Sequence, residues 1–346
     1  MLRLVDANLD RLGEGLRVLE DASRFLLNDA VLSKRLKSLR HTLVKGLGPL
    51  EQELLSARRV AEDVGAPAAK RAALQHQDLP ALVAANSRRV QESLRVLEEF
   101  SRLSGGPLAG KAGIFENARF ELYDLEQQLV GQLLRHDKAA RLNGLYLVLD
   151  TMALKGRDEV EVAAAAIRGG VKTIQLRDKQ RGKPELLAVA RKLRTLCAKK
   201  GVFFIVNDHL DIALSVKADG LHLGQDDLPP AEARLILPID MLIGCSTHST
   251  AEALRAQADG ADYVAVGSIY ATTSKEKFKL VGPETLRRTR SRVSVPLIAI
   301  GGINHANVQE VMKAGADGVA VISAVLGADD VEKAARRLAA KMKRIY

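Results

Sequence analysis

Apolar residues in the first 135 positions recur at α-helical spacing almost throughout. The first seam has steps of four and three residues, which place its side chains on one helix face. It consists of Val5, Leu9, Leu12, Leu16 and Leu19. Asn28 and Asp29 end this segment and can cap a second helix. The helical period continues there at Val31, Leu32, Leu36, Leu39 and Leu43. With further helical stretches near 50–59, 78–103 and 115–135, the pattern predicts an all-helical domain over residues 1–138.

The second half of the chain changes to short apolar runs rich in Val and Ile. They cover 144–150, 171–178, 202–208, 220–224, 241–246, 263–270, 296–302 and 318–323. Helical patterns such as 184–200, 251–259 and 304–314 lie between them. Buried strands that alternate with helices indicate a parallel sheet, and eight such units are typical of a (β/α)8 TIM barrel. We expect this α/β barrel over 144–346, with the polar segment 136–143 as a linker.

An open, doubly wound sheet is the alternative to a barrel. Eight units of similar length, with no glycine-rich dinucleotide-binding turn after the first strand, favour closure.

Composition narrows the class of protein. Of the 346 residues, 47% are apolar and 27% charged, as in an ordinary soluble globular chain. The net charge of +10 suggests nucleic acid, but aromatic residues are only 3% and Trp is absent, which leaves little for base stacking. Residues 1–140 hold 21 Lys and Arg against 19 Asp and Glu, and residues 141–346 hold 31 against 23. The excess positive charge therefore lies on the barrel, which suits small anionic substrates better than nucleic acid.

The two cysteines and the short apolar runs indicate the cellular compartment in which the protein is expected. Cys197 and Cys245 are too few for a disulfide framework and are interpreted as core residues. Charges interrupt the N-terminus, and the longest apolar runs have six or seven residues, so neither a signal peptide nor a membrane span is predicted. We expect a cytoplasmic protein.

A repeat with an offset of 78 residues lies inside the helical half. The segment 7–20 aligns with 85–98, and a polar stripe recurs in both copies. The stripe comprises Asn8, Arg11, Glu14, Arg17 and Asp21 in the first copy and Asn86, Arg89, Glu92, Arg95 and Glu99 in the second. Pairing of charges along a solvated helix face is one interpretation. A ligand site is the other, because the same order of residue types occurs twice.

Polar residues gather where the predicted strands end, which is where such barrels hold their active sites. The set comprises Gln175, Arg177, Lys179, Asn207, Asp208, Gln225, Asp226, Asp227, Ser246, His248, Thr272, Thr273, Ser274 and Lys275. Gly301 and Gly302 after the seventh strand, with Ser323 after the eighth, suit a phosphate bound by backbone N–H groups. Carboxylates among cations suit Mg²⁺ and a diphosphate together. The histidines show no paired zinc spacing, and His222 is expected to be a packed or hydrogen-bonded barrel residue.

The motifs of the second half resemble the thiamine-phosphate synthase family. They are QLRDK (175–179), ND (207–208), ADGLHLGQDDLP (218–229), GCSTH (244–248), DYVAVGSIYATTSK (262–275), AIGGI (299–303) and GVAVISA (318–324). The resemblance implies that hydroxymethylpyrimidine diphosphate and hydroxyethylthiazole phosphate combine to thiamine phosphate and pyrophosphate. Ser274 replaces the usual Thr, which keeps the hydroxyl, and Ala271 replaces the common Pro.

This resemblance assigns roles to individual residues. For the pyrimidine diphosphate it implies Gln175, Leu176, Arg177, Asp178, Lys179, Asn207, Ser246 and Lys275. For the thiazole phosphate it implies Thr272, Thr273, Ser274, Gly302, Ile322 and Ser323. Arg177, Lys179, Ser246 and Lys275 would be catalytic, and Asp208 and Asp227 would hold one Mg²⁺ per barrel.

The helical half resembles the domain often fused ahead of these synthases. The similar stretches are 6–25, LKSLRH (36–41), 85–103 and ARFELYDLE (118–126). The resemblance implies a hydroxymethylpyrimidine-phosphate kinase, for which the candidates are Asn8, Arg11, Glu14, Arg17, Asn86, Arg89, Glu92 and Arg95. No Walker-type glycine loop is present in the sequence, so an oligomerisation or docking module stays open. The amphipathic helices are compatible with a homo-oligomer.

Two other functions remain as alternatives for the whole chain. One is a thiazole tautomerase or another phosphate-binding barrel, which would not need the combination of QLRDK, Asp208, Asp227 and Lys275. The other is a non-catalytic, thiamine-related regulator with a scaffolding helical domain.

Overall fold

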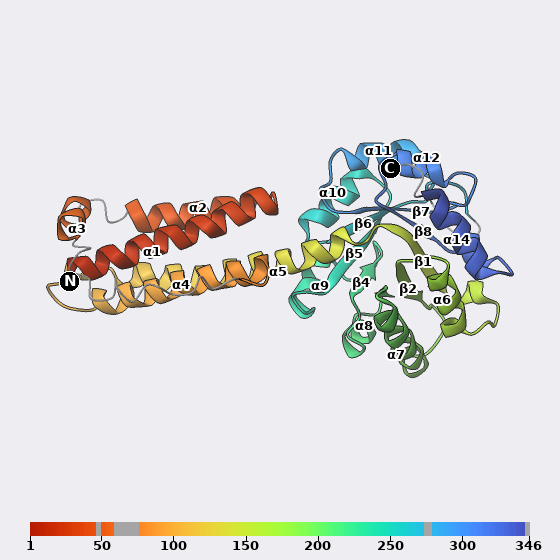
Figure 1. Cartoon of the computed structure of the whole chain (residues 1–346), viewed down its shortest axis with the longest axis horizontal. Helices are drawn as coiled ribbons and strands as arrows, with labels where there is room; N and C mark the ends of the chain where they lie inside the picture. Colours follow the sequence, from red (N-terminus) through yellow and green to blue (C-terminus); the bar gives the residue numbers. More distant parts are fainter. Residues whose placement is uncertain (46–49, 59–75, 273–278, 343–346) are drawn as a thin grey trace. The chain divides into compact units, whose positions relative to one another are not determined.

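The computed structural model describes residues 1–45, 50–58, 76–272 and 279–342. The chain divides into two compact units, Met1–Leu134 and Arg135–Tyr346, and each has its own apolar core (Figure 1). No helix in these described stretches is long and apolar enough to span a membrane.

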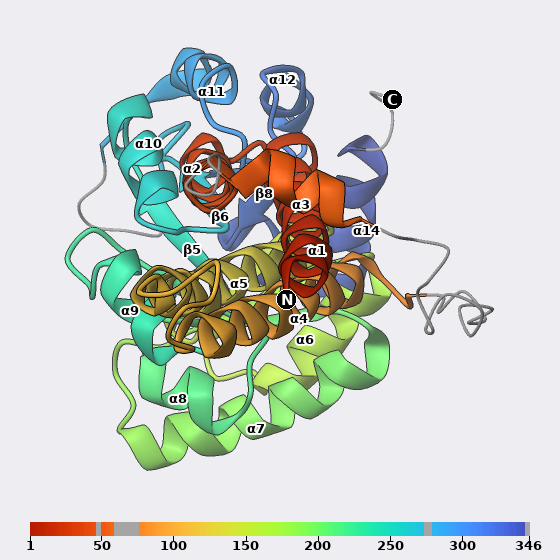
Figure 2. The same ribbon diagram turned by 90° about the vertical axis from the view of Figure 1, so that its left-hand side faces the viewer.

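The first unit is entirely helical over its described residues. Its elements are α1 (Leu2–Asp21), η1 (Ala22–Leu26), α2 (Ala30–Lys45), α3 (Glu51–Ala57), α4 (Leu79–Ser101) and α5 (Ala112–Ala140), the last of which continues into the second unit. Figure 2 views these helices nearly end-on. The predicted seam is confirmed, because Val5, Leu12, Leu16 and Leu19 are fully buried and Leu9 is partly buried against the same core.

Capping and packing set the ends and the partners of these helices. Asp29 accepts the backbone N–H groups of Val31 and Leu32, both at 2.9 Å, so the predicted cap is confirmed. Val31 itself is 73% exposed, so this predicted position does not lie on the buried face of α2. Helices α1 and α4 pack closely: a Cβ at Gly15 would lie only 2.5 Å from the Val90 side chain.

The second unit is a closed barrel of eight parallel strands in sequence order, as predicted (Figure 1). The strands are β1 (Gly144–Asp150), β2 (Thr173–Arg177), β3 (Phe203–Asn207), β4 (Gly220–Leu223), β5 (Leu242–Thr247), β6 (Tyr263–Val266), β7 (Leu297–Ile300) and β8 (Gly318–Val321). Pairing of Gly144 with Gly318 closes the ring. Nearly every strand residue is buried, since helices cover the barrel outside and side chains fill its interior.

Helices follow most of the strands and lie around the barrel. They are η5 (Met152–Leu154), α6 (Glu159–Arg168), α7 (Lys183–Lys200), α8 (Leu210–Ser215), α9 (Pro230–Ile236), α10 (Thr250–Ala258), α11 (Gly282–Arg290), α12 (Val308–Lys313), α13 (Ser323–Leu326) and α14 (Val331–Met342). Cys197 and Cys245 are buried core residues, as expected, and burial raises the pKa of each thiol to about 12.

The predicted linker differs from the structure. Residues 136–140 continue α5, and only 141–143 lie between this helix and β1. Within the predicted linker Lys138 donates to Asp240 at 2.7 Å, and just before it Arg135 donates to Asp262 at 2.8 Å. Ala139 and Leu142 are buried in the barrel core. Because these polar side chains are paired, their lack of an apolar period does not mark a linker.

Candidate active site

The ends of β2 and β3 place three predicted residues at the barrel mouth. Gln175, Arg177 and Asn207 all line one hollow there, which we call the central hollow. Gln175 and Asn207 are buried, whereas the Arg177 side chain is 19% exposed and forms an ion pair with Asp150 at the end of β1. A partly buried arginine with one carboxylate partner keeps N–H donors for an anionic ligand.

The other members of the QLRDK motif have different positions. Leu176 is buried in the core, since alternate strand residues face opposite sides. The Asp178 carboxylate is buried and accepts the backbone N–H groups of Gln180 and Arg181 at 2.9 and 3.0 Å. Asp178 thus orders the loop after β2. Lys179 is exposed, and its Nζ lies 3.1 Å from an Asp208 oxygen.

Two carboxylates lie side by side near Lys179. Asp208 has a left-handed backbone (φ +61°), and its side chain is within hydrogen-bonding reach of Asp227. Burial and the adjacent Asp208 raise the pKa of Asp227, although the Gly224 N–H donates to Asp227 at 2.6 Å. Two carboxylates brought together in this way suit a bound cation, which would relieve their mutual repulsion.

This carboxylate pair has the donor set of magnesium rather than zinc. Within the described parts of the chain, no group of three or more His, Cys, Asp and Glu gathers as a metal site. Mg²⁺ needs only one or two protein carboxylates, because water and substrate phosphate oxygens fill its other positions. The residues present therefore fit Mg²⁺ held together with a phosphorylated substrate.

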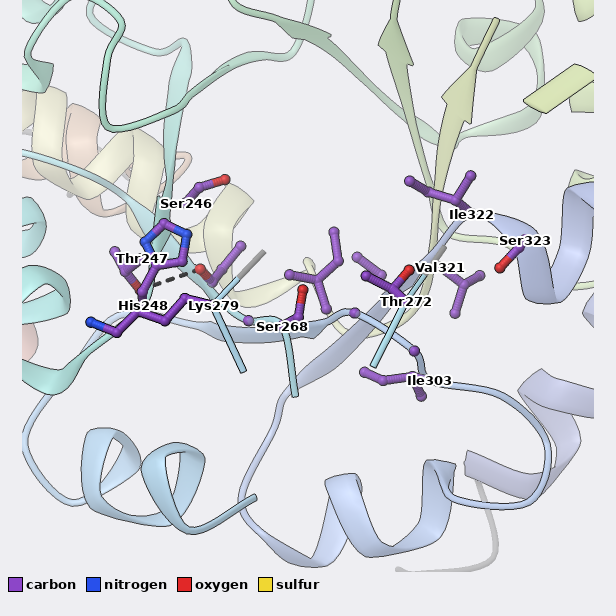
Figure 3. Close-up of a pocket in the computed structure, with 16 residues that line it drawn as sticks. Ser246, Thr247, His248, Ser268, Thr272, Lys279, Ile303, Val321, Ile322 and Ser323 are labelled. Carbon is purple, nitrogen blue, oxygen red and sulfur yellow. Dashed lines mark hydrogen bonds between the residues drawn. The ribbon is translucent and has the colours of Figure 1, made fainter. Parts of the chain in front are cut away.

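A second hollow lies beside the first, lined by residues at the ends of β5 to β8 and in the loops that follow them. Figure 3 shows Ser246, His248 and Lys279 on one side of it and Thr272, Ile322 and Ser323 on the other. Ser246 and Ile322 line both hollows, so the two are adjacent.

Glycines shape this second hollow. Gly301 and Gly302 have positive φ angles of +101° and +64°. A Cβ at Gly301 would meet the Ser268 backbone at 2.5 Å, and one at Gly302 would meet the Ala271 carbonyl oxygen. Only glycine combines this conformation with such close approach. The loop can therefore bring its backbone N–H groups close to a ligand, as the sequence predicted for a phosphate.

Three predicted residues, Thr273, Ser274 and Lys275, lie outside the described residues. The sequence analysis also missed two residues: Asp150, the partner of Arg177, and Lys279, which lines the second hollow. A signal for Asp150 was available, because it is the last residue of β1 and therefore lies at the active-site end. The expectation for His222 is confirmed: it is buried and bonded to Tyr263 and Ser246 at 3.0 Å each.

The repeat of the first unit separates into paired and unpaired residues. Asn8 and Asn86 are buried, and each donates to the carbonyl oxygen four residues earlier, Leu4 at 2.8 Å and Leu82 at 2.9 Å. Arg17 pairs with Glu20 and Asp21, and Arg95 pairs with Glu98 and Glu99. These ion pairs support the first interpretation of the stripe, charge pairing along the helix face. The second interpretation, a ligand site, stays open because the rest of the stripe takes no part in this network.

The remaining four residues of the stripe are exposed. They are Arg11, Glu14, Arg89 and Glu92. Among the described residues none of them has an ion pair or a side-chain hydrogen bond, in either copy of the repeat. The buried carboxylates Glu20 and Glu98 instead receive arginines from the second helix of each copy, Arg40 at 2.8 Å and Arg119 at 3.1 Å.

Closed parallel barrels that gather cations, carboxylates and a glycine-lined hollow at one mouth define a class of phosphate-handling enzymes. Within that class, residues 145–325 match the family model described as thiamine monophosphate synthase. The chain belongs to the thiamine-phosphate synthase family. Residues 3–128 match a second model, described as the ThiD2 family.

Individual relatives cover almost the whole chain. The thiamine-phosphate synthase of Thermosynechococcus vestitus is 42% identical over 97% of this chain and 93% of its own length. That of a Synechococcus species (strain CC9311) is 41% identical over 97% and 94%. Among solved structures, thiamine phosphate pyrophosphorylase from Pyrococcus furiosus is 40% identical with a TM-score of 0.55, covering 59% of this chain and 97% of its own.

Proposed function

We propose that the barrel joins hydroxymethylpyrimidine diphosphate to hydroxyethylthiazole phosphate and releases pyrophosphate, forming thiamine phosphate. The observation that carries this proposal is that one barrel mouth holds the carboxylate pair Asp208 and Asp227 beside Lys179 and, at the ends of β5 to β8, a hollow with glycine-formed walls. A diphosphate and a monophosphate need two such adjacent anion sites. Membership of the thiamine-phosphate synthase family supports the same reaction.

The reaction exchanges a C–O bond for a C–N bond. The bond between the pyrimidine methylene and the diphosphate breaks, and its electron pair leaves with the diphosphate oxygen. The thiazole nitrogen lone pair forms the new bond, which leaves the positive charge on the thiazolium ring. No proton moves in this exchange, so the site needs no general base. Arg177, Lys179 and Lys275 neutralise the charge that grows on the leaving group, and Ser246 and Asn207 help to hold the substrate.

Asp208 and Asp227 would hold the magnesium ion that we propose as the cofactor. When bound, the ion would supply electrostatic stabilisation of the leaving diphosphate. Thr272, Thr273, Ser274, Gly302, Ile322 and Ser323 would hold the thiazole phosphate. Lys279 adds a cation to that group, because it lines the same hollow as Thr272 and Ser323.

Mixing both substrates with the full chain and Mg²⁺ tests this function directly. We expect thiamine phosphate and pyrophosphate in equal amounts, and no product when the metal is chelated. Asp227→Ala is the matched variant, since it removes one carboxylate of the pair. Conversion of a thiazole phosphate isomer without the pyrimidine would identify a tautomerase instead, and the absence of any product would refute the proposal.

For the first unit we propose phosphorylation of hydroxymethylpyrimidine phosphate, which would supply the substrate of the barrel. The match to the ThiD2 family supports a kinase-related role. Arg11, Glu14, Arg89 and Glu92 are the candidates that lack structural partners among the described residues, whereas Asn8, Arg17, Asn86 and Arg95 also serve the fold.

The kinase test uses the full chain with Asp227→Ala, so that any diphosphate accumulates. Pyrimidine monophosphate and ATP should yield the diphosphate, and Arg11→Ala or Arg89→Ala should lower its formation at least about 10-fold, as for loss of a charged contact. Formation of no diphosphate would leave an oligomerisation or docking module as the role of the first unit.

We further propose a cytoplasmic location, small-molecule partners without nucleic acid, and a homo-oligomer. Light scattering tests the oligomeric state.

A further inference from the structure

A chain of hydrogen bonds crosses the interior of the barrel beneath the mouth. Gln175 Nε2 on β2 donates to the Tyr146 hydroxyl on β1 at 2.7 Å, and that hydroxyl lies 3.1 Å from the Tyr263 hydroxyl on β6. The Tyr263 oxygen lies 3.0 Å from His222 Nδ1 on β4, and His222 Nε2 lies 3.0 Å from Ser246 Oγ on β5. Five strands thus contribute one continuous path.

The path joins two residues that we place at the pyrimidine diphosphate. Gln175 and Ser246 both line the central hollow, and so do Tyr146 and His222. Tyr263 is fully buried and connects the two halves. Its ring fits because residue 244 is glycine: a Cβ there would overlap the phenol ring. Gly244 therefore leaves the space that the Tyr263 ring and its hydroxyl occupy.

We propose that Tyr146, Tyr263 and His222 are positioning residues, which couple the hydrogen-bonding state of the Gln175 amide to that of the Ser246 hydroxyl. This proposal rests on the proposed synthase function, because it concerns how that substrate is held. Each member of the path has both a donor and an acceptor, so the hydrogens can align in either of two senses. What binds at one end selects the sense for the whole path.

In the first sense the hydrogens run from Gln175 toward Ser246. Tyr146 then donates to Tyr263, Tyr263 donates to His222 Nδ1, and His222 donates from Nε2 to Ser246. The Ser246 hydroxyl hydrogen is left to donate into the mouth, where an ionised diphosphate offers only acceptors. At the other end Gln175 keeps its Oε1 as an acceptor, which suits the amino group of an aminopyrimidine.

In the opposite sense the Gln175 amide is turned over, so that Tyr146 donates to its Oε1 and its NH2 group instead faces the aminopyrimidine. Ser246 then donates inward to His222 and turns only lone pairs toward the diphosphate, which repel it. Both ends of the substrate therefore favour the same alignment, and the path makes them cooperate. Burial supports this coupling, because it raises the pKa of Tyr146 and Tyr263 above the usual range and keeps both phenols neutral.

A double-mutant cycle with Tyr263→Phe and Ser246→Ala tests the coupling. Tyr263→Phe keeps the ring and interrupts the path. Alone, it should lower kcat/KM for the pyrimidine diphosphate about 10-fold, as for the loss of a hydrogen bond to a charged group, with KM for the thiazole phosphate unchanged. In the Ser246→Ala background it should cost less than about 2-fold, because no hydroxyl remains to be oriented.

Tyr270→Phe is the matched control, since the Tyr270 hydroxyl bonds only to Glu310 on α12 among the contacts in the described structure, at 2.7 Å. It should leave kcat/KM unchanged. Equal costs of Tyr263→Phe in both backgrounds would show a merely structural role and overturn the proposal. If Tyr263→Phe does not fold, Tyr146→Phe interrupts the same path and the same cycle decides. A wild-type chain without synthase activity would instead refute the proposed function.

Discussion

Asp150 illustrates how one buried side chain can control an active-site cation. Its carboxylate is 4% exposed, pairs with Arg177 and accepts the Met152 N–H at 3.1 Å. Asp150→Asn keeps the hydrogen-bond acceptor but removes the charge that holds the guanidinium in place. We expect KM for the pyrimidine diphosphate to rise about 10-fold, as for the loss of a charged hydrogen bond.

Steady-state kinetics with each substrate varied in turn checks this expectation. Asp158→Asn is the control, because Asp158 caps α6 through the Val160 and Glu161 N–H groups and an amide oxygen can replace its acceptor. An unchanged KM in Asp150→Asn would mean that Arg177 does not depend on this partner.

For Asp227 and Lys275 we predict a larger loss of activity, because both act on the leaving group in the proposed reaction. Asp227→Ala or Lys275→Ala should lower turnover by about 10²- to 10³-fold, the usual loss when one electrostatic contact to a transition state is removed. Far-ultraviolet circular dichroism should be unchanged. Single-turnover rates near wild type in either variant would contradict the assignment.

Residues at the strand ends were predictable because the fold class fixes where active sites lie. Gln175, Arg177, Asn207 and Ser246 follow from this rule, and each lines the central hollow. Lys279 did not follow, since it comes thirteen residues after Val266, the end of β6, and reaches the second hollow only through the course of its loop. The pairing of Arg177 with Asp150 also depends on which strands are neighbours, and this is a property of the closed sheet.

Among the elements, α1 offers two glycines with opposite surroundings. A Cβ at Gly15 would lie 2.5 Å from the Val90 side chain on α4, whereas a Cβ at Gly13 would have nothing within 4 Å. Gly15→Ala should destabilise the first unit by about 1–3 kcal/mol through overpacking. Gly13→Ala should stabilise it by about 0.5–1 kcal/mol, because alanine favours the helix. Urea unfolding followed by circular dichroism measures both, and equal effects would contradict the close packing of α1 and α4.

Element boundaries were predicted best where burial alone decides them. The eight apolar runs became eight strands because a strand buried on both faces leaves an unbroken apolar signal. Helix α12 is shorter than its pattern over 304–314, since the Asn307 side chain accepts from the Asn304 N–H and donates to the Gly302 carbonyl oxygen in the preceding turn. Such local competition between side chain and helix leaves no mark on the apolar period.

At the scale of the molecule, the two units have separate apolar cores and different ligands under our proposals. Pyrophosphate with Mg²⁺ should therefore stabilise the barrel alone. At 100 times Kd the stabilisation is about 2.7 kcal/mol, which raises the melting temperature of a unit of this size by about 5–10 °C. Calorimetry of the full chain should show one transition that moves with the ligand and one that does not.

Two variants assign these transitions. Gly15→Ala should lower the midpoint temperature of only the transition that pyrophosphate does not shift, because Gly15 is buried on α1 of the helical unit. Asp227→Ala should abolish the ligand-induced shift and leave the helical transition in place. A single transition that moves as a whole in every case would show that the units unfold cooperatively. In that event ligand binding in the barrel would stabilise the helical unit as well, and the two proposed activities would be thermodynamically linked.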